Sequence, residues 1–238
     1  MTTADRPRLC LLPGLDGTGR LYLPLANALA DIDIDVLYYD ATQFHGYASL
    51  ADALAPALSQ HDDVVLVAES FAGPLGVLLA YRHPERVRAL VMAASFVRAP
   101  LPFSGFVAML LQGLPSVAPP LFALERLLAG SGLPFPLRAE FEAIVSSIPL
   151  RVLRQRALAA LRVEVTKELA ALEMPVLYLQ ARHDRLIRPQ AGREVTRLAR
   201  NARHAVIDAP HFLFQMAPEA AAAEIRNLLD ALYKTPPR

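Results

Sequence analysis

The stretch of sequence that decides the fold is Val64-Val65-Leu66-Val67-Ala68-Glu69-Ser70-Phe71-Ala72-Gly73. Its first five residues are apolar and mostly β-branched, which is typical of a buried strand, and the apolar residues after position 70 have the spacing of a helix. Ser70 stands where the two patterns meet. The stretch therefore predicts a strand, a tight turn that carries a serine, and a helix.

Similar apolar runs recur on both sides of this segment and alternate with stretches of helical periodicity. This alternation predicts an α/β fold with a parallel sheet built from strand-helix-strand units. We expect strands at residues 8–12, 35–39, 64–68, 89–93, 176–180 and 205–207. We expect helices at residues 21–30, 49–59, 71–82, 190–200 and 218–233.

One interval, residues 97–172, is too long for a single crossover and is rich in Leu, Pro and Phe. We interpret it as a helical lid inserted within a single domain that spans residues 1–238, with short helices at 106–111, 121–128 and 138–161. Its apolar side chains suit either an acyl pocket or plain packing of the lid helices. These side chains are Phe103, Phe106, Met109, Leu110, Leu114, Leu121, Phe122 and Phe135.

The composition excludes several classes of protein. Of 238 residues, 54% are hydrophobic and 20% are charged, so the chain can bury a sizeable core. The net charge of +1, without a basic stripe, argues against a nucleic-acid partner. The polar start of the chain and the lack of an apolar run of about 20 residues predict a cytoplasmic protein without stable membrane insertion.

Cys10 is the only cysteine, so neither an intrachain disulfide nor a cysteine-based zinc site can form. It stands in an apolar run, and we expect it to be a small buried side chain in a strand.

The predicted turn at Ser70 has a particular stereochemistry. A nucleophile at a sharp strand-to-helix turn is forced toward a left-handed backbone, and its neighbours at two positions on either side must be small. Ala68 and Ala72 meet that demand. The alternative is an ordinary serine that caps a helix.

A second segment, Leu11-Leu12-Pro13-Gly14-Leu15-Asp16-Gly17-Thr18-Gly19, follows the first predicted strand. Its glycines free the backbone to turn amide groups toward a ligand, as an oxyanion site requires. A phosphate site is the alternative, but the segment lacks the Lys-Ser/Thr end of a P-loop and the spacing of a dinucleotide site.

Together these segments resemble the α/β-hydrolase superfamily. Ala68-Glu69-Ser70-Phe71-Ala72 is similar to its G-x-S-x-G nucleophile elbow, with alanine in place of both glycines, and Pro13-Gly14 stands where the family's oxyanion loop has His-Gly. The resemblance implies a mostly parallel sheet, trimmed here to about six strands. It also implies that the backbone amides of Leu15 and Phe71 form the oxyanion and substrate-binding site.

The same resemblance assigns the two partners of Ser70. The segment 181–189 is similar to the family's acid loop and places the acid at Asp184, and Ala209-Pro210-His211-Phe212 is similar to the histidine loop. Because ligands bind at the carboxyl ends of parallel strands, we expect these side chains to converge there. Asp40 and Asp208, also near strand ends, are rival acids.

The remaining histidines are weaker candidates for the base. His45 follows a predicted strand and could line the pocket, whereas His61 and His83 fall at a polar turn and a helix end. His183 is expected to point away from the site, and His204 precedes a predicted strand and so lies at the wrong end of the sheet.

The resemblance implies a serine hydrolase that cleaves carboxylic esters of short or medium acyl chains through an acyl-enzyme on Ser70. Such a reaction needs no cofactor or metal, and its partner is a small-molecule acyl ester; the oligomeric state stays open. One alternative is an acyl-thioesterase or acyltransferase, because residues 12–17 are also similar to the opening loop of some acyl-transferring relatives. Another is a non-catalytic ligand-binding protein on a hydrolase scaffold.

Overall fold

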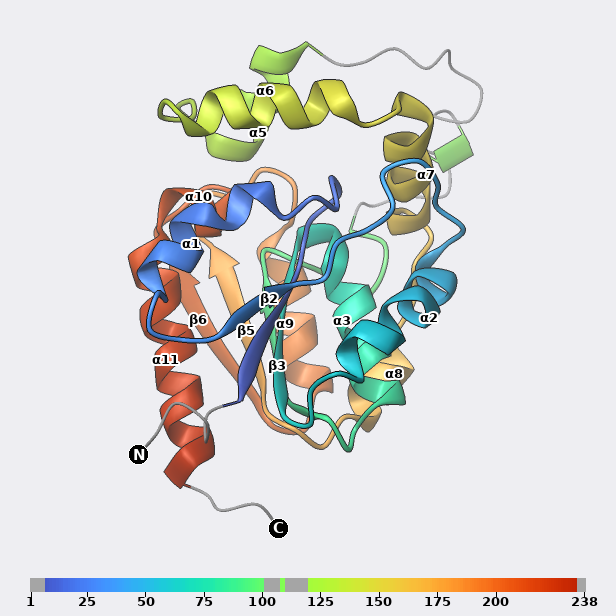
Figure 1. Cartoon of the computed structure of the whole chain (residues 1–238), viewed down its shortest axis with the longest axis vertical. Coiled ribbons are helices and arrows are strands. Elements are labelled where there is room, and N and C mark those ends of the chain that lie inside the picture. The colour runs from blue at the N-terminus through green and yellow to red at the C-terminus, as the bar shows by residue number, and fades with distance from the viewer. Residues whose placement is uncertain (1–6, 101–107, 110–119, 235–238) are drawn as a thin grey trace.

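The computed structural model describes residues 7–100, 108–109 and 120–234. Within them lies a sheet of six parallel strands, as the sequence predicts, and their order is β2-β1-β3-β4-β5-β6 (Figure 1). The strands are β1 (Arg8–Leu12), β2 (Ile34–Val36), β3 (Val64–Glu69), β4 (Val87–Ala93), β5 (Val176–Ala181) and β6 (Ala202–Ile207).

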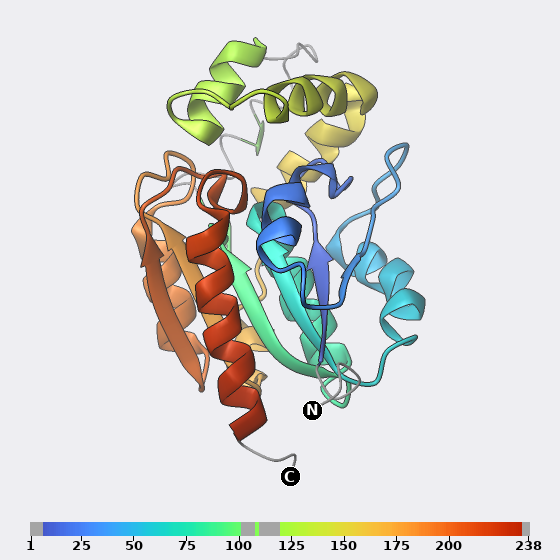
Figure 2. The same cartoon turned by 60° about the vertical axis from the view of Figure 1, so that its left-hand side comes forward.

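Helices cover both faces of the sheet (Figures 1 and 2). One face carries α1 (Leu23–Ala28), α10 (Leu213–Met216) and α11 (Pro218–Lys234), which contact one another. The other face carries α2 (Tyr47–Leu58), α3 (Gly73–Arg82), α8 (Thr166–Ala171) and α9 (Pro189–Leu198). Two 3₁₀ turns, η2 (Arg20–Tyr22) and η3 (Ser70–Ala72), precede α1 and α3.

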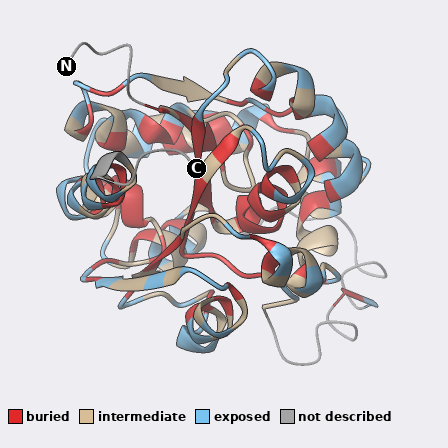
Figure 3. Cartoon of the chain, turned by 90° about the horizontal axis from the view of Figure 1, so that it is seen from below, coloured by how far each residue is buried: buried red, intermediate tan, exposed pale blue. Residues whose placement is uncertain are grey.

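The strands supply the core on both of their faces. Leu66 and Ala68 of β3 belong to the apolar cluster under α2 and α3, and Val65 and Val67 belong to the cluster under α1 and α11. Cys10 in β1 is also buried, as expected. Figure 3 shows buried strands at the centre and exposed outer sides of the helices. This two-sided burial explains why the strands read as continuous apolar runs.

A group of helices between β4 and β5, which we call the insert, lies across the end of the sheet toward which the strands point (Figures 1 and 2). Its described helices are α5 (Leu121–Ala129), α6 (Leu137–Ser147) and α7 (Leu150–Ala160). The two chain segments that join it to the sheet pair with each other. Val165 N donates to Val97 O at 2.8 Å and Ala99 N donates to Val163 O at 3.1 Å, which forms a two-stranded neck.

The insert differs from the sequence prediction in one respect that has a clear cause. The predicted helical stretch 138–161 is divided into α6 and α7 at Ile148 and Pro149. Proline has no amide hydrogen and forces the preceding residue out of the helical region, and Ile148 is extended, with φ −96° and ψ 128°. The predicted helix at 106–111 lies outside the described residues except for positions 108 and 109.

The largest differences in strand boundaries occur in β2 and β6. Strand β2 ends at Val36 rather than residue 39, because its partner β1 is followed by Pro13, which cannot donate a hydrogen bond to a ladder. Strand β6 begins at Ala202 rather than residue 205. It is an edge strand, and its polar residues Arg203 and His204 hide the apolar signal.

Among the helices of the described residues, none is both long and apolar enough to cross a membrane.

Candidate active site

Ser70 lies directly after β3, where the strand turns into η3 and α3. Its φ of 50° is in the left-handed region, which confirms the expectation for a strained turn. The turn is crowded: Ala68 and Ala72 are fully buried, and a Cβ added to Gly76 would meet the Ala68 Cβ at 3.0 Å. A helix-capping serine has an extended backbone instead, so that alternative does not describe Ser70.

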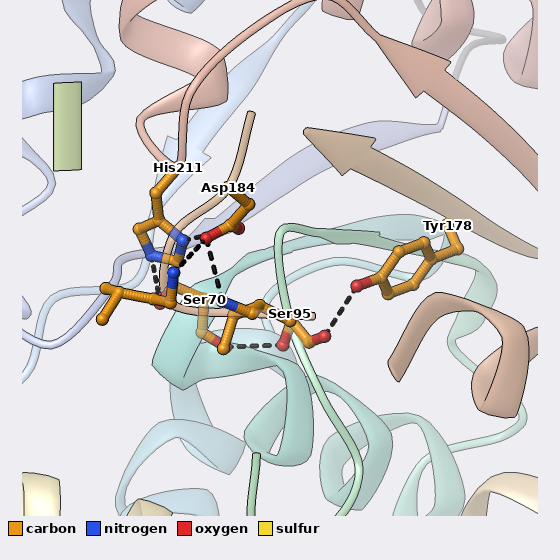
Figure 4. Close-up of polar contacts among 7 residues, drawn as sticks. Ser70, Ser95, Tyr178, Asp184 and His211 are labelled. Atoms are coloured by element: carbon orange, nitrogen blue, oxygen red, sulfur yellow. Dashed lines mark hydrogen bonds and ion pairs between the residues drawn. The ribbon is translucent and has the colours of Figure 1, made fainter. Parts of the chain in front are cut away.

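Ser70, His211 and Asp184 form a continuous hydrogen-bonded chain, seen in Figure 4. His211 Nε2 lies 2.8 Å from Ser70 Oγ, and His211 Nδ1 lies 2.8 Å from Asp184 Oδ2. The side chains of His211 and Asp184 are each 3% exposed. Because water is nearly excluded, the histidine and the carboxylate have each other as partners rather than solvent.

The backbone after β5 holds the carboxylate in place. Asp184 Oδ1 accepts hydrogen bonds from the amides of Leu186 at 2.8 Å and Ile187 at 2.9 Å. Both bonds use one oxygen, which leaves Oδ2 for the histidine. A carboxylate fixed by three donors has little freedom to rotate away from the ring.

A hydrogen-bonded pair behind the turn, Ser95 and Tyr178, was not predicted from the sequence. Ser95 Oγ donates to the carbonyl oxygen of Ser70 at 2.5 Å, and Tyr178 Oη donates to the carbonyl oxygen of Ser95 at 2.7 Å (Figure 4). Gly73 N also donates to the Ser70 carbonyl. These residues come from β5, the end of β4 and the start of α3, so the turn is fixed from several elements.

The glycine-containing loop after β1 lies beside the same site. A turn forms in which Gly17 N donates to Gly14 O at 3.1 Å, and Tyr39 Oη donates to Pro13 O at 2.8 Å. Leu15 and Phe71, the two predicted oxyanion residues, line one cavity together with Ser70. The structure therefore brings every predicted site residue to one place.

The cavity has a volume of about 430 Å³ and a mainly apolar wall. Its polar lining side chains are Asp16, Glu69, Ser70 and His211. The insert contributes most of the apolar part of the wall. The insert residues that line the cavity include Leu124, Leu127, Leu128, Phe141, Ile144, Val145, Leu153 and Ala157.

The sequence left the apolar residues of the insert open between pocket and packing, and none of the four described ones lines the cavity. Met109, Phe122 and Phe135 are exposed, by 58%, 70% and 85%, and do not line the cavity. Leu121 packs against the core but also stays outside the cavity wall. A helix turns only one stripe of its apolar residues inward, and composition does not identify that stripe. Phe103, Phe106, Leu110 and Leu114 lie outside the described residues.

Glu69 is a buried carboxyl group next to Ser70 that sequence reasoning passed over. It is 6% exposed, and Gln215 Nε2 donates to its Oε2 at 3.3 Å. Burial raises the pKa of Glu69 from its usual 4.5 to about 8, because the charged form loses its hydration. The group is therefore mostly protonated at pH 7. No local signal marks it, because its position in the turn motif accepts many residue types.

The rival acids lie in other hydrogen-bonded groups. Asp208 Oδ1 is 2.8 Å from His183 Nε2, and Asp40 Oδ1 accepts a bond from Thr42 Oγ1 at 2.6 Å. This geometry leaves Asp184 as the carboxylate in contact with His211.

The other histidines also lie away from Ser70. His45 is exposed, contacts Gln43 and does not line the cavity. His204 lies within β6 rather than before it, which corrects the prediction, and contacts Gln180 at 3.0 Å. Within the described ranges, no group of three or more His, Cys, Asp or Glu side chains is arranged to hold a metal ion.

The sheet order, the strand-turn-helix around Ser70 and the placement of His211 and Asp184 at the carboxyl ends of the strands define an α/β-hydrolase fold. A family model described as serine aminopeptidase, S33, matches residues 44–219, which include all three side chains. The chain belongs to this family of α/β hydrolases.

Solved structures of similar fold cover nearly the whole chain. A hydrolase from Pseudomonas aeruginosa PA01 is 19% identical, with a TM-score of 0.79 over 95% of this chain and 91% of that one. An enol-lactonase from Burkholderia xenovorans LB400 is 16% identical, with a TM-score of 0.80 over 95% and 92%. The esterase EaEST from Exiguobacterium antarcticum is 15% identical, with a TM-score of 0.80 over 94% and 92%. These likenesses establish the fold.

A local sequence similarity points to a plant protein. Phytyl ester synthase 1, chloroplastic, from Arabidopsis thaliana is 33% identical over 109 residues. The match covers 41% of this chain and 15% of the plant protein.

Proposed function

We propose that this chain is a serine carboxylester hydrolase that acts on short or medium acyl chains through an acyl-enzyme on Ser70. The observation that carries the proposal is the hydrogen-bonded chain from Ser70 through His211 to Asp184, which ends at an apolar cavity. A nucleophile, a base within reach of its proton and a group that orients the base are what acyl transfer requires.

In the first half of the reaction, His211 Nε2 takes the Ser70 proton while Ser70 Oγ forms a bond to the acyl carbon. The amides of Leu15 and Phe71 stabilise the negative oxygen of the tetrahedral intermediate, a contribution on the order of 3 kcal/mol per donor. His211 then gives the proton to the leaving alcohol as the carbon–oxygen bond breaks. Asp184 holds the ring in the required tautomer and stabilises its charged form.

In the second half, water replaces the alcohol. His211 takes a proton from the water as the water oxygen bonds to the acyl carbon, and the proton returns to Ser70 Oγ when the acyl-enzyme breaks. The products are a carboxylic acid and free Ser70. The chain's own residues supply every proton transfer in this cycle.

The apolar cavity supports a hydrocarbon acyl group. Burial of one CH₂ contributes about 0.8 kcal/mol, which corresponds to about a fourfold change in kcat/KM. We expect kcat/KM for p-nitrophenyl esters to rise by about this factor with each added methylene and to stop rising when the cavity is full. A profile that falls from acetate onward would contradict the acyl-pocket assignment.

The proposed nucleophile is tested by labelling. A fluorophosphonate probe should label the folded protein at Ser70, as read from peptide mass spectrometry, and Ser70→Ala should abolish the label. Ser49→Ala is the matched control, because Ser49 is an exposed serine on α2 and should leave the labelling unchanged. A folded wild-type protein that stays unlabelled would sink the enzyme proposal and favour a ligand-binding protein.

Acyl transfer or thioester cleavage is a second candidate, which the local similarity to a protein named phytyl ester synthase favours. Both reactions use the same acyl-enzyme, and they differ in leaving group and acceptor. Incubation with an acyl ester, and separately with an acyl-thioester, in the presence of a long-chain alcohol separates the candidates. A product dominated by the new ester indicates transfer, and a product dominated by the free acid indicates hydrolysis.

A further inference from the structure

Arg156, on helix α7 of the insert, is fully buried and reaches the loop after β1. Its Nη1 donates to the carbonyl oxygens of Leu15 at 2.9 Å and Asp16 at 2.8 Å, and its Nη2 donates to the carbonyl oxygen of Asp40 at 2.7 Å. The guanidinium carbon also lies 5.5 Å from the centre of the Tyr39 ring. One side chain of the insert therefore clamps two successive peptide groups of the loop.

A buried cation in this position is costly to the fold. Removing a guanidinium from water costs several kcal/mol unless other groups compensate. Among the described residues, no carboxylate lies within ion-pair distance of Arg156; backbone carbonyls are its hydrogen-bond acceptors. The hydrogen bonds to three carbonyl oxygens offset part of this cost, so Arg156 ties the insert to the backbone of the loop rather than to apolar side chains of the core.

The hydrogen bonds of Arg156 affect the direction of the Leu15 N–H group. In a trans peptide the C=O and N–H groups point in opposite directions. The Gly14–Leu15 peptide is held on its oxygen side by Gly17 N, and the Leu15–Asp16 peptide is held on its oxygen side by Arg156. With both peptides around the Leu15 Cα fixed, the Leu15 N–H has a fixed direction beside Ser70.

We propose that Arg156 is a positioning residue that orients the Leu15 amide toward the developing oxyanion. Through this residue the insert contributes to stabilisation of the transition state. This inference rests on the proposed function. Arg156 itself does not touch the reacting atoms. Its effect passes through the loop, and the insert therefore contributes to the rate as well as to the wall of the cavity.

A positioning role and a purely structural role of Arg156 predict different changes in kcat and KM. An oxyanion contact forms only in the transition state, so its loss lowers kcat and leaves KM nearly unchanged. A loosened insert would instead weaken binding of the acyl chain and raise KM. A trifluoromethyl ketone, which forms a tetrahedral adduct with serine, reports the same difference as an inhibition constant.

The test compares Arg156→Met with Arg151→Met. Both positions lie on α7 and both arginines donate to a backbone carbonyl, but Arg151 is exposed and binds Thr42 O at 3.2 Å, away from the loop. For Arg156→Met we expect kcat to fall by about 10- to 100-fold, KM to stay within about twofold, and ketone affinity to fall in parallel with kcat/KM. Arg151→Met should match the wild type in all three measurements.

Thermal unfolding followed by circular dichroism establishes that each variant is folded at the assay temperature. If Arg156→Met is not folded, the same kinetic comparison is made with Arg156→Lys. Lysine keeps the charge but lacks the forked guanidinium that reaches several carbonyl groups. A folded Arg156→Lys with reduced kcat and unchanged KM supports the proposal. Wild-type kcat in either folded variant, or a loss confined to KM, overturns it.

Failure of this inference is separate from failure of the proposed function. A wild-type protein that is labelled at Ser70 and hydrolyses esters, beside an equally fast Arg156→Met, removes only the role of Arg156. A wild-type protein that does neither removes the proposed function.

Discussion

Ser95 Oγ donates a hydrogen bond to the carbonyl oxygen of Ser70, and the two atoms lie 2.5 Å apart. The carbonyl belongs to the same peptide group as the Phe71 N–H, which points in the opposite direction. Ser95 therefore fixes the peptide group that carries the Phe71 amide, whereas Arg156 acts on the Leu15 amide through the next peptide group, whose carbonyl oxygen it binds. The two halves of the oxyanion site are supported by residues from the end of β4 and from the insert.

Loss of the Ser95 hydroxyl should slow the reaction without unfolding the protein. Because Gly73 N still binds the Ser70 carbonyl, we expect Ser95→Ala to lower kcat by about three- to tenfold, the value of one hydrogen bond. Steady-state kinetics with a p-nitrophenyl ester measures the change. An unchanged kcat would show that the Gly73 amide alone orients the peptide.

Gly73 has no room for a side chain. A Cβ at this position would lie 1.8 Å from Ser95 Oγ and 2.8 Å from Ser95 Cβ, so Gly73→Ala should reduce the free energy of unfolding by about 1–3 kcal/mol. Urea unfolding measures the loss. The double variant Gly73→Ala with Ser95→Gly removes both clashing atoms and should be more stable than Gly73→Ala alone; an equal or lower stability would contradict the steric explanation.

The carboxylate behind His211 can be tested against its rival. Asp184→Asn should lower kcat by about 10³- to 10⁴-fold, because the amide favours the wrong tautomer of the histidine and no longer stabilises its charged form. Asp208→Asn, which affects a carboxylate in contact with His183, should change kcat by less than about twofold. The opposite ranking of the two variants would move the role to Asp208.

The raised pKa of Glu69 predicts that the stability of the fold depends on pH. Its pKa is about 8 in the folded protein and near 4.5 when unfolded, so between these values the folded state keeps a proton that the unfolded state has lost. Stability from this group is therefore fully present below about pH 4.5 and is lost as pH rises to about 8, by up to about 1.36 kcal/mol per pH unit.

Glu69→Gln removes the titrating proton and should flatten this decline. Urea unfolding between about pH 5.5 and 8.5, across most of the window set by the two pKa values, should show a steeper loss of stability for the wild type than for Glu69→Gln. Glu85→Gln, at an exposed position, serves as the control and should follow the wild type. Parallel curves for all three proteins would mean that Glu69 is not neutral in the folded state.

The cavity wall should set the length of the acyl chain. Val145 on α6 lines the cavity, so Val145→Phe should shift the preferred p-nitrophenyl ester to a shorter acyl chain, with little effect on acetate. Ala143→Phe places the same side chain on the exposed side of the same helix and should leave the profile unchanged. A profile that is the same in all three proteins would place the acyl chain elsewhere.

The sequence predicted the sheet well because the signals of its strands are local, and the motifs that suggested the site residues are local too. Strands buried on both faces read as continuous apolar runs, and Ser70, Asp184 and His211 each follow a strand in a short motif. The boundaries of β2 and β6 were less accurate, because ladder bonding ends at a proline in one case and an edge strand exposes polar residues in the other.

The missed residues are those whose roles depend on distant contacts. Arg156 is one of several arginines on α7, and nothing in the local spacing shows that it is the buried one. Ser95, in the loop after β4, and Tyr178, in β5, support the turn at Ser70 from other parts of the chain. The exposed Phe122 and Phe135 were misplaced because composition shows that a helix has an apolar side but not what that side meets.

The neck, in which residues 97–99 pair with residues 163–165, makes the insert a separable unit of the fold. Both ends of the insert leave the sheet side by side, so a different insert could be spliced at the neck without a change in the register of β4 and β5. Substrate range could then diversify while the chemistry at the strand ends is retained. Arg156 sets the condition for such a chimera: a transplanted insert must bring its own donor to the carbonyls of Leu15 and Asp16.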